Sequence, residues 1–224
     1  MSARDRILSK INRQVAQGAP EARAQSVRDR LTKPKQTAPR PSQSHSEHAA
    51  TVEQFAARAT AADATVSHIS SFDELPTALS NELRQRNIGQ MVRMGDDPAL
   101  AALDWRALEI SHGKGRIDEP ATLSVAPMAT AETGTLGLIS GPNNPVTLTF
   151  LGETHFVAIR ASDITPGMEE MWAKFRASGA DPRTINLVTG PSRSADIGQQ
   201  LQLGAHGPIA LHIFIVGDVP DPVG

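Results

Sequence analysis

The turn at residues 189–193, with the sequence TGPSR, carries residue types that bind anions. It follows an apolar segment at 185–188 and precedes a segment at 194–203 that we predict to be a helix. Free backbone N–H groups at a helix start, beside hydroxyl and guanidinium side chains, suit a carboxylate or a phosphate. The candidate ligand-binding residues of this turn are Thr189, Gly190, Ser192 and Arg193. An ordinary capped helix, with Arg193 paired to Asp196, explains the same residues equally well.

A second polar cluster, ETGT at residues 132–135, stands directly before an apolar segment. Its carboxylate, Glu132, has the chemistry of a general base, a nucleophile or a partner for a ligand hydroxyl group. Gly134 permits a backbone conformation, or a close approach of a ligand, that other residues resist, and Thr133 and Thr135 add hydroxyl groups. Ser140, which opens the turn SGPNNP after that segment, completes the ligand-binding candidates. The alternative is a helix end at which Glu132 faces water.

Among the seven histidines, His206 is the second catalytic candidate beside Glu132, because it lies in the loop GAHGP at 204–208. The pKa of a histidine is close to neutrality, so its imidazole can take up and release a proton at physiological pH. A structural role in an α/β core is the alternative for His206, and His155 and His212 are weaker candidates. The histidines lack the helical i, i+4 spacing with a companion carboxylate that marks a metal site, so we assign no metal.

Composition excludes several kinds of chemistry. The chain has 224 residues and no cysteine, which removes disulfides, thiolate zinc sites, iron–sulfur ligation and cysteine nucleophiles. In any redox process, the electron carrier must then sit in another protein or be a bound organic cofactor. Aromatic residues are only 4% and tyrosine is absent, which argues against base stacking with nucleic acid. The apolar runs fall short of the ~20 residues of a membrane span, and the N-terminus lacks a signal-peptide pattern, so we expect a cytoplasmic protein without a membrane span.

The residues from 47 to 224 must position these groups, and we predict that they form one domain. Strand-like and helix-like segments alternate along it, which is typical of an α/β fold with an open, mostly parallel sheet flanked by helices. The predicted strands are 65–69, 90–94, 135–140, 146–151, 155–160, 185–188 and 211–216. The predicted helices are 52–59, 73–86, 98–103, 167–177 and 194–203.

Residues 1–46 differ in character from the rest of the chain. The first 40 residues carry ten Lys or Arg against three Asp or Glu, a charge of +7, and the remainder therefore carries −9 of the total −2. Ser2 is a plausible cap for a helix with an apolar stripe at Ile7, Leu8 and Ile11, and we expect residues 18–46, rich in Pro, Gln and Arg, to be a linker. This basic arm suits nucleic acid, anionic lipid or an acidic protein; a solvated tail is the simpler interpretation.

At these motifs the chain resembles the lactate-utilization (LUD) domain family. The resemblance is carried by the strings ETGT (132–135), SGP (140–142), LTFLGETH (148–155), NLVTGPSRSADI (186–197), LGAHGP (203–208) and LH (211–212), and it covers roughly residues 47–216. It implies a fold similar to the sugar-phosphate isomerase and CoA-transferase type. It also implies a role beside two iron–sulfur partner proteins in oxidising L-lactate to pyruvate, as part of an L-lactate dehydrogenase complex. The clusters would belong to those partners, which fits the absence of cysteine.

The resemblance transfers no catalytic residues, so the site candidates rest on local chemistry. The central expectation is that the segments around Glu132 and Arg193 meet at one edge of the sheet and enclose a pocket for a carboxylate or a phosphate. Two other roles stay open: a non-catalytic assembly or regulatory subunit that docks the partners through its basic arm, and an independent enzyme acting on sugar phosphates or CoA esters.

Overall fold

The structure is a computed structural model that describes residues 2–15, 19–32, 39–44, 48–196 and 200–217. It divides into two units, residues Met1–Arg40 and Pro41–Gly224, which are described separately below. Within the described ranges, no helix is both long and apolar enough to cross a membrane.

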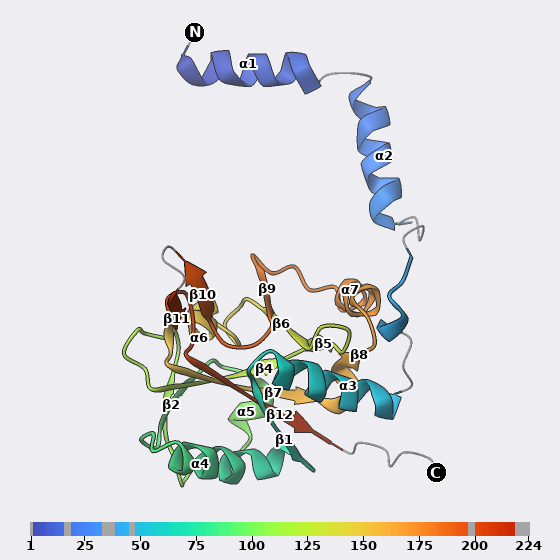
Figure 1. Ribbon diagram of the computed structural model, residues 1–224. Helices are drawn as coiled ribbons and strands as arrows, with labels where there is room; N and C mark the ends of the chain where they lie inside the picture. Colours follow the sequence, from blue (N-terminus) through green and yellow to red (C-terminus); the bar gives the residue numbers. More distant parts are fainter. Residues whose placement is uncertain (1, 16–18, 33–38, 45–47, 197–199, 218–224) are drawn as a thin grey trace. The chain divides into compact units, whose positions relative to one another are not determined.

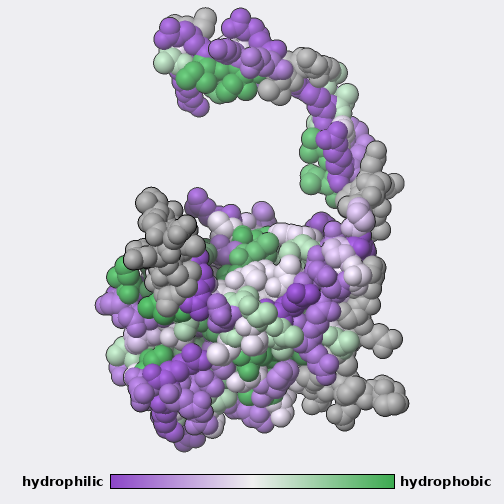
Figure 2. Space-filling model, viewed as in Figure 1, coloured by the Kyte–Doolittle hydropathy of each residue, from purple (hydrophilic) through white to green (hydrophobic). Residues whose placement is uncertain are grey.

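The first unit contains two helices, α1 (Ala3–Val15) and α2 (Pro20–Thr32). The expected cap is present, since Asp5 N–H donates to Ser2 Oγ at 3.2 Å and Ser2 N–H donates back to the Asp5 carboxylate. Along one side of α1 the apolar stripe is exposed (Figure 2): Ile7, Leu8 and Ile11 keep about half or more of their surface.

Helix α2 corrects the sequence analysis, which expected a linker across residues 18–46. Pro20 suits the first turn of a helix, and the Ala, Gln and Arg residues that follow are good helix formers. Side-chain pairs on one face, such as Gln25 with Asp29, add local support. None of the described side chains of α2 is buried. The sequence therefore lacks the apolar face by which a helix is usually predicted. Residues 18, 33–38 and 45–46 of the expected linker lie outside the described residues.

The second unit is built on a six-stranded parallel sheet (Figure 1). In spatial order its strands are β1 (Thr65–Ile69), β12 (Ala210–Val216), β7 (Thr154–Arg160), β4 (Ala121–Ala126), β2 (Met91–Met94) and β3 (Glu109–His112). Each adjacent pair is parallel. The predicted class, an open and mostly parallel α/β fold, is therefore confirmed.

The two faces of this sheet pack against different layers. On one face, α3 (His48–Ala61) and a smaller sheet contribute Phe55 and Leu136 to a core with Ile213. On the other face, α4 (Leu75–Gln85) and the short α5 (Pro98–Ala101) pack Leu79 and Leu100 near Phe214. Because helices and strands cover both faces, the central strands β4 and β7 are buried almost throughout.

The smaller sheet has four strands, in the order β8 (Ile164–Thr165), β5 (Met128–Thr130), β6 (Thr135–Ile139) and β9 (Ile185–Val188). Strand β6 pairs antiparallel with both β5 and β9, whereas β5 and β8 are parallel. Helix α7 (Met168–Ala177) buries Met171 beside β5 and β8. Three short 3₁₀ turns, Ser42–Ser44, Phe72–Glu74 and Ala161–Asp163, complete the described elements.

Two predicted elements are wrong. Residues 146–151, expected as a strand, form helix α6 (Val146–Leu151), which follows Pro145 and receives a hydrogen bond from Thr122 Oγ1 at the Leu148 carbonyl. The expected helix at 194–203 is instead an antiparallel hairpin, β10 (Arg193–Asp196) and β11 (Gln200–Leu203). The alternation QLQL in β11 has the period of two that a strand requires. Ile197 lies outside the described residues.

Candidate functional site

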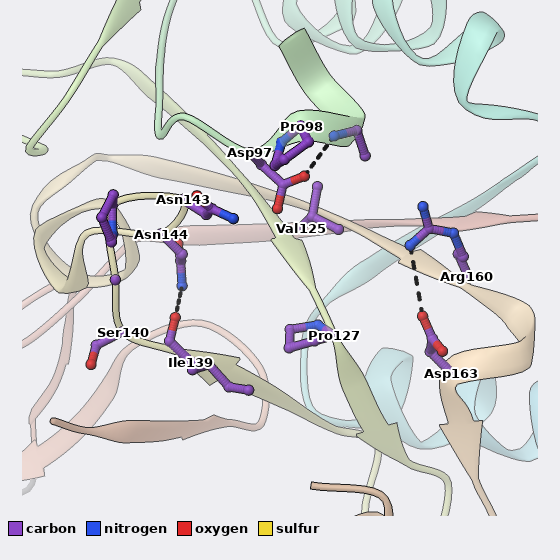
Figure 3. A pocket seen from close by; sticks show the side chains of 13 residues that line it. Asp97, Pro98, Val125, Pro127, Ile139, Ser140, Asn143, Asn144, Arg160 and Asp163 are labelled. Atoms are coloured by element: carbon purple, nitrogen blue, oxygen red, sulfur yellow. Dashed lines mark hydrogen bonds and ion pairs between the residues drawn. The ribbon is translucent and has the colours of Figure 1, made fainter. Parts of the chain in front are cut away.

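A cavity of about 570 Å³ opens at the carboxyl ends of the parallel strands (Figure 3). We call it the carboxyl-edge cavity. It is lined by residues that follow β2 (Asp97, Pro98, Ala99), by the end of β4 (Val125, Pro127), by the end of β6 and its turn (Ile139, Ser140, Gly141, Pro142, Asn143, Asn144) and by residues at the end of β7 (Arg160, Asp163).

Strand order explains why a cavity forms here. Strands β2 and β4 are neighbours, but the chain continues from β2 to β3 on one side and from β4 to β7 on the other. Where connections leave two adjacent parallel strands in opposite directions, a crevice opens outside their carboxyl ends, and this is where open α/β proteins bind ligands. The cavity therefore lies at the topological switch point of the sheet.

Arg160 is the cationic side chain of the cavity wall. Its guanidinium lies 4.8 Å from the centre of the Phe72 ring, which holds it in place by a cation–π contact. Arg160 Nη1 is 3.9 Å from Asp163 Oδ2, the outer limit of an ion pair, whereas Lys174 Nζ binds Asp163 Oδ1 directly. Lys174 is thus the main ion-pair partner of Asp163. The half-exposed Arg160 guanidinium therefore has N–H donors that can bind an anion.

A buried chain of polar groups supports the opposite wall. Ser124 Oγ donates to Asn144 Oδ1 at 2.7 Å, and His155 Nε2 lies 3.0 Å from Ser124 Oγ. Because the serine gives its only proton to Asn144, it must accept one from His155, so His155 carries its proton on Nε2. Complete burial lowers the pKa of His155 to about 3, which keeps it neutral. Its Nδ1 finds no hydrogen-bond partner within the described part of the chain.

The turn at 140–145 is also locked to the loop after β2. Asp96 N–H donates to the Pro142 carbonyl at 3.2 Å. The backbone approach is so close that a Cβ on Gly95 would lie 2.1 Å from the Asn143 carbonyl oxygen. Asp97 accepts the Ala99 N–H through Oδ1 at 2.9 Å. The cavity wall is therefore a preformed framework of two interlocked loops.

The predicted segments around Glu132 and Arg193 do approach one another, through β6 and β9. The hydroxyl groups of Thr133 and Thr135 are 2.6 Å apart, and Thr135 Oγ1 is 2.7 Å from Thr189 Oγ1. Gly134 and Gly190 both have positive φ. These two glycines let their turns pack against the end of α3 and the residue that follows it: a Cβ on Gly134 would lie 2.5 Å from the Ala59 nitrogen, and one on Gly190 would lie 1.9 Å from the Ala62 carbonyl oxygen. The structure thus brings together three of the five predicted hydroxyl groups, those of Thr133, Thr135 and Thr189.

Glu132 and Arg193 themselves engage other groups. Glu132 Oε2 accepts the Met168 N–H at 3.2 Å, at the start of α7. Arg193 Nε binds Asp63 Oδ2 at 3.0 Å on the surface. Neither side chain lines the carboxyl-edge cavity, and a hairpin rather than a helix follows Arg193, so the helix-start anion site loses its geometric basis. Of the predicted residues, Ser140 lines this cavity.

His206 lies at the opposite edge of the parallel sheet. It lines a smaller hollow of about 250 Å³ next to Glu153 and Ile209, which precede β7 and β12. Its backbone N–H donates to Ser192 Oγ at 3.3 Å, so these two predicted residues do meet. The exposed side chains of Ile117 and Phe150 make this hollow largely apolar. Glu132 does not line this hollow.

Arg160, Asp97 and Asn144 escaped the sequence analysis as functional residues. Arg160 ends a strand, Asp97 follows one and Asn144 lies in a turn, and these positions are typical of ligand sites in α/β proteins. Across the described ranges, His, Asp and Glu side chains do not gather in groups of three that could hold a metal ion.

Similarity to known proteins agrees with this architecture. The LUD domain family model matches residues 119–216. Lactate utilization protein C from Geobacillus thermodenitrificans is 31% identical over 168 residues, covering 65% of this chain and 70% of that protein. The protein of the same name from Geobacillus kaustophilus is 33% identical with the same coverage. Lactate utilization protein C from Geobacillus sp. is 34% identical over 124 residues, and this match covers 52% of this chain and 52% of that protein.

A crystal structure of a DUF162 family protein from Deinococcus radiodurans shares the fold. Its TM-score is 0.62 at 21% identity, and the match covers 77% of this chain and all of that one. Fold and cavity together define an open α/β protein with a ligand-sized crevice at its switch point. The chain belongs to the LUD domain family.

Proposed function

We propose that this chain is a subunit of an L-lactate oxidation system and binds an organic anion in the carboxyl-edge cavity. The main support is that Arg160 lines a preformed cavity at the switch point of the sheet. Arg160 also lies within the segment that the LUD domain model matches. Relatives that are 31–34% identical to this chain are named lactate utilization protein C. We infer the pathway from that name.

The chemistry requires partners. Oxidation of L-lactate to pyruvate removes two electrons and two protons, one proton from the hydroxyl-bearing carbon and one from its hydroxyl group. Iron–sulfur clusters can accept the electrons, but their usual ligands are cysteine thiolates and this chain has none. We therefore place the clusters in two partner proteins, as the family resemblance implies, and keep the cytoplasmic location expected from the sequence. In this proposal, the chain contributes a binding site to the complex.

The test is growth on L-lactate. Deleting the gene should abolish growth on L-lactate but not on pyruvate, and the wild-type chain should restore it. Arg160→Ala should fail to restore growth, whereas Arg176→Ala, which removes an exposed arginine from α7, should succeed. Unimpaired growth of the deletion strain on L-lactate would refute the pathway, and full rescue by Arg160→Ala would refute the role of the cavity.

A specific feature favours a second candidate, the assembly role. The exposed stripe of Ile7, Leu8 and Ile11 on a basic helix is suited to cover an apolar, acidic surface of another protein. The double variant Leu8→Glu/Ile11→Glu should then lose the co-purifying cysteine-rich proteins while its ligand affinity is unchanged. Retention of those partners by the variant would dismiss this role.

A further inference from the structure

The carboxyl-edge cavity is larger than lactate requires. Its volume is about 570 Å³. Lactate has six non-hydrogen atoms, and even at the ~30 Å³ that a water molecule takes in the liquid they would fill only roughly 180 Å³. Cavities of roughly 300–1,000 Å³ enclose ligands of drug size. A ligand several times larger than lactate fits the available space.

The polar groups of the cavity stand on opposite sides of an apolar floor. Figure 3 shows Arg160 and Asp163 on one side, Asn143 and Asn144 on the other, and Val125 and Pro127 between them. A small hydroxy acid held at Arg160 would leave the amide side of the cavity unused. A ligand that meets both sides must carry an anionic group at one end and hydrogen-bonding groups at the other.

We propose that the cavity binds a phosphorylated ligand of mononucleotide size. Its phosphate lies on Arg160, its body covers Val125 and Pro127, and its polar far end reaches Asn143. This inference rests on the proposed function only in using the same cavity, and it names the class of ligand that the cavity takes.

The charges near Arg160 favour a phosphate. A guanidinium offers two parallel N–H donors to phosphate oxygens, and the Phe72 ring beneath it fixes its plane. The nearest carboxylate, Asp163, is bound by Lys174 at its other oxygen, which offsets its repulsion of an anion. Two cations thus face one carboxylate at this end of the cavity.

The remaining walls suit a ring and its hydroxyl groups. Val125, Pro127 and Ile139 offer an apolar surface to a flat ring or a sugar face. Asp97 uses Oδ1 for the Ala99 N–H, and Figure 3 shows its other oxygen on the cavity side, where it can accept a ligand hydroxyl. The exposed Asn143 amide supplies both a donor and an acceptor.

The experiment is calorimetric titration of the full chain with adenosine monophosphate, flavin mononucleotide, ribose 5-phosphate, inorganic phosphate and L-lactate. At least one of the three larger probes should bind at least tenfold more tightly than inorganic phosphate and L-lactate. Arg160→Ala should weaken that binding by roughly tenfold to a hundredfold, the range of a charge-assisted hydrogen bond. Asn143→Ala should weaken it by roughly two- to tenfold and leave the affinity for inorganic phosphate unchanged. Arg176→Ala is the control and should bind like wild type.

The outcomes separate this inference from the proposed function. If L-lactate binds through Arg160 and no larger probe binds better, the inference fails while the proposed function stands. If a larger probe binds but Asn143→Ala has no effect, the far end of the cavity is not used and the inference fails as well. A nucleotide that binds through both residues while the deletion strain grows normally on L-lactate would support the inference and overturn the pathway. The relative affinities of the three larger probes show whether the cavity prefers an adenine, a flavin or no base beside the sugar phosphate.

Discussion

The Ser124 hydroxyl group donates a 2.7 Å hydrogen bond to Asn144 Oδ1, and both side chains are buried. Ser124 lies on the central strand β4 and Asn144 in the turn that walls the carboxyl-edge cavity. This contact, continued by His155, couples the middle of the sheet to the ligand loop.

Ser124→Ala should therefore destabilise the protein and loosen the cavity wall. The substitution strips a buried partner from both Asn144 and His155, at a cost of about 1–3 kcal/mol in the free energy of unfolding. Urea denaturation measures this loss, and ligand titration should show weaker binding. Ser70→Ala, at an exposed position, is the control and should stay within about 0.5 kcal/mol of wild type. Equal stability of the two variants would show that the buried chain contributes little.

Stability should fall as the pH drops below 6.5. Burial lowers the pKa of His155 to about 3 from an ordinary 6.5, and burial together with the charge of Arg86 does the same for His212. Between these values the unfolded chain binds more protons than the folded one. The stabilising contribution is therefore complete above pH 6.5 and is lost progressively toward pH 3.

Each of the two histidines should contribute a slope of up to about 1.4 kcal/mol per pH unit in that window. Urea denaturation at several pH values gives the slope, and His155→Gln should flatten it. Imidazole NMR signals provide an independent check, because both rings should stay neutral in the folded protein at pH 5. A charged ring at that pH would contradict the predicted pKa.

Gly190→Ala should be among the costly single changes in the smaller sheet. Its φ of +73° is strained for alanine, and the added Cβ would lie 1.9 Å from the Ala62 carbonyl oxygen. The two effects together amount to roughly 2–5 kcal/mol. Gly179→Ala is a matched control, since its φ is +67° with no atom within 4 Å of the new Cβ. The control should cost only about 1–2 kcal/mol, and a similar loss in both variants would mean that the close contact with Ala62 is unimportant.

Two arginines can be compared as anion-binding groups. In titrations with lactate, pyruvate and sugar phosphates, Arg193→Ala should change affinity by no more than about twofold, the size of a 0.5 kcal/mol surface effect. Its guanidinium is already paired with Asp63, and no helix start lies beside it. Loss of binding in Arg193→Ala, with normal binding in Arg160→Ala, would restore the site predicted from the sequence.

The sequence predicted the parallel sheet because strands such as β7 and β12 are largely apolar runs that include β-branched residues. The sequence did not predict β4, because its residues ATLSVA mix small and polar types. Thr122 and Ser124 can be buried there because their hydroxyl groups form hydrogen bonds with residues distant in the sequence. The β-branched run at 146–151 predicted a strand, but Pro145 and packing against β4 make it a helix. Local propensity yields to tertiary contacts at such short segments.

The cavity was harder to predict than the sheet. Arg160 and Asn144 are ordinary residue types, and they line one cavity only because the spatial order of the strands differs from their order in the chain. The motif-rich segments at 132–135 and 189–193 instead hold the smaller sheet against α3 through Thr135, Thr189 and two glycines. A conspicuous motif can thus have a packing role while the ligand wall is formed by less conspicuous residues.

The position of β12 has a consequence for biosynthesis. Thr65 of β1 pairs in register with His212, which follows it by 147 residues. A ribosome adding ~5–20 residues per second needs roughly 7–30 s to make that interval. During this time the nascent β1 lacks its neighbouring strand and has a bare edge that other chains could pair with. Chaperones that shield such edges should therefore hold this protein until translation has passed residue 216.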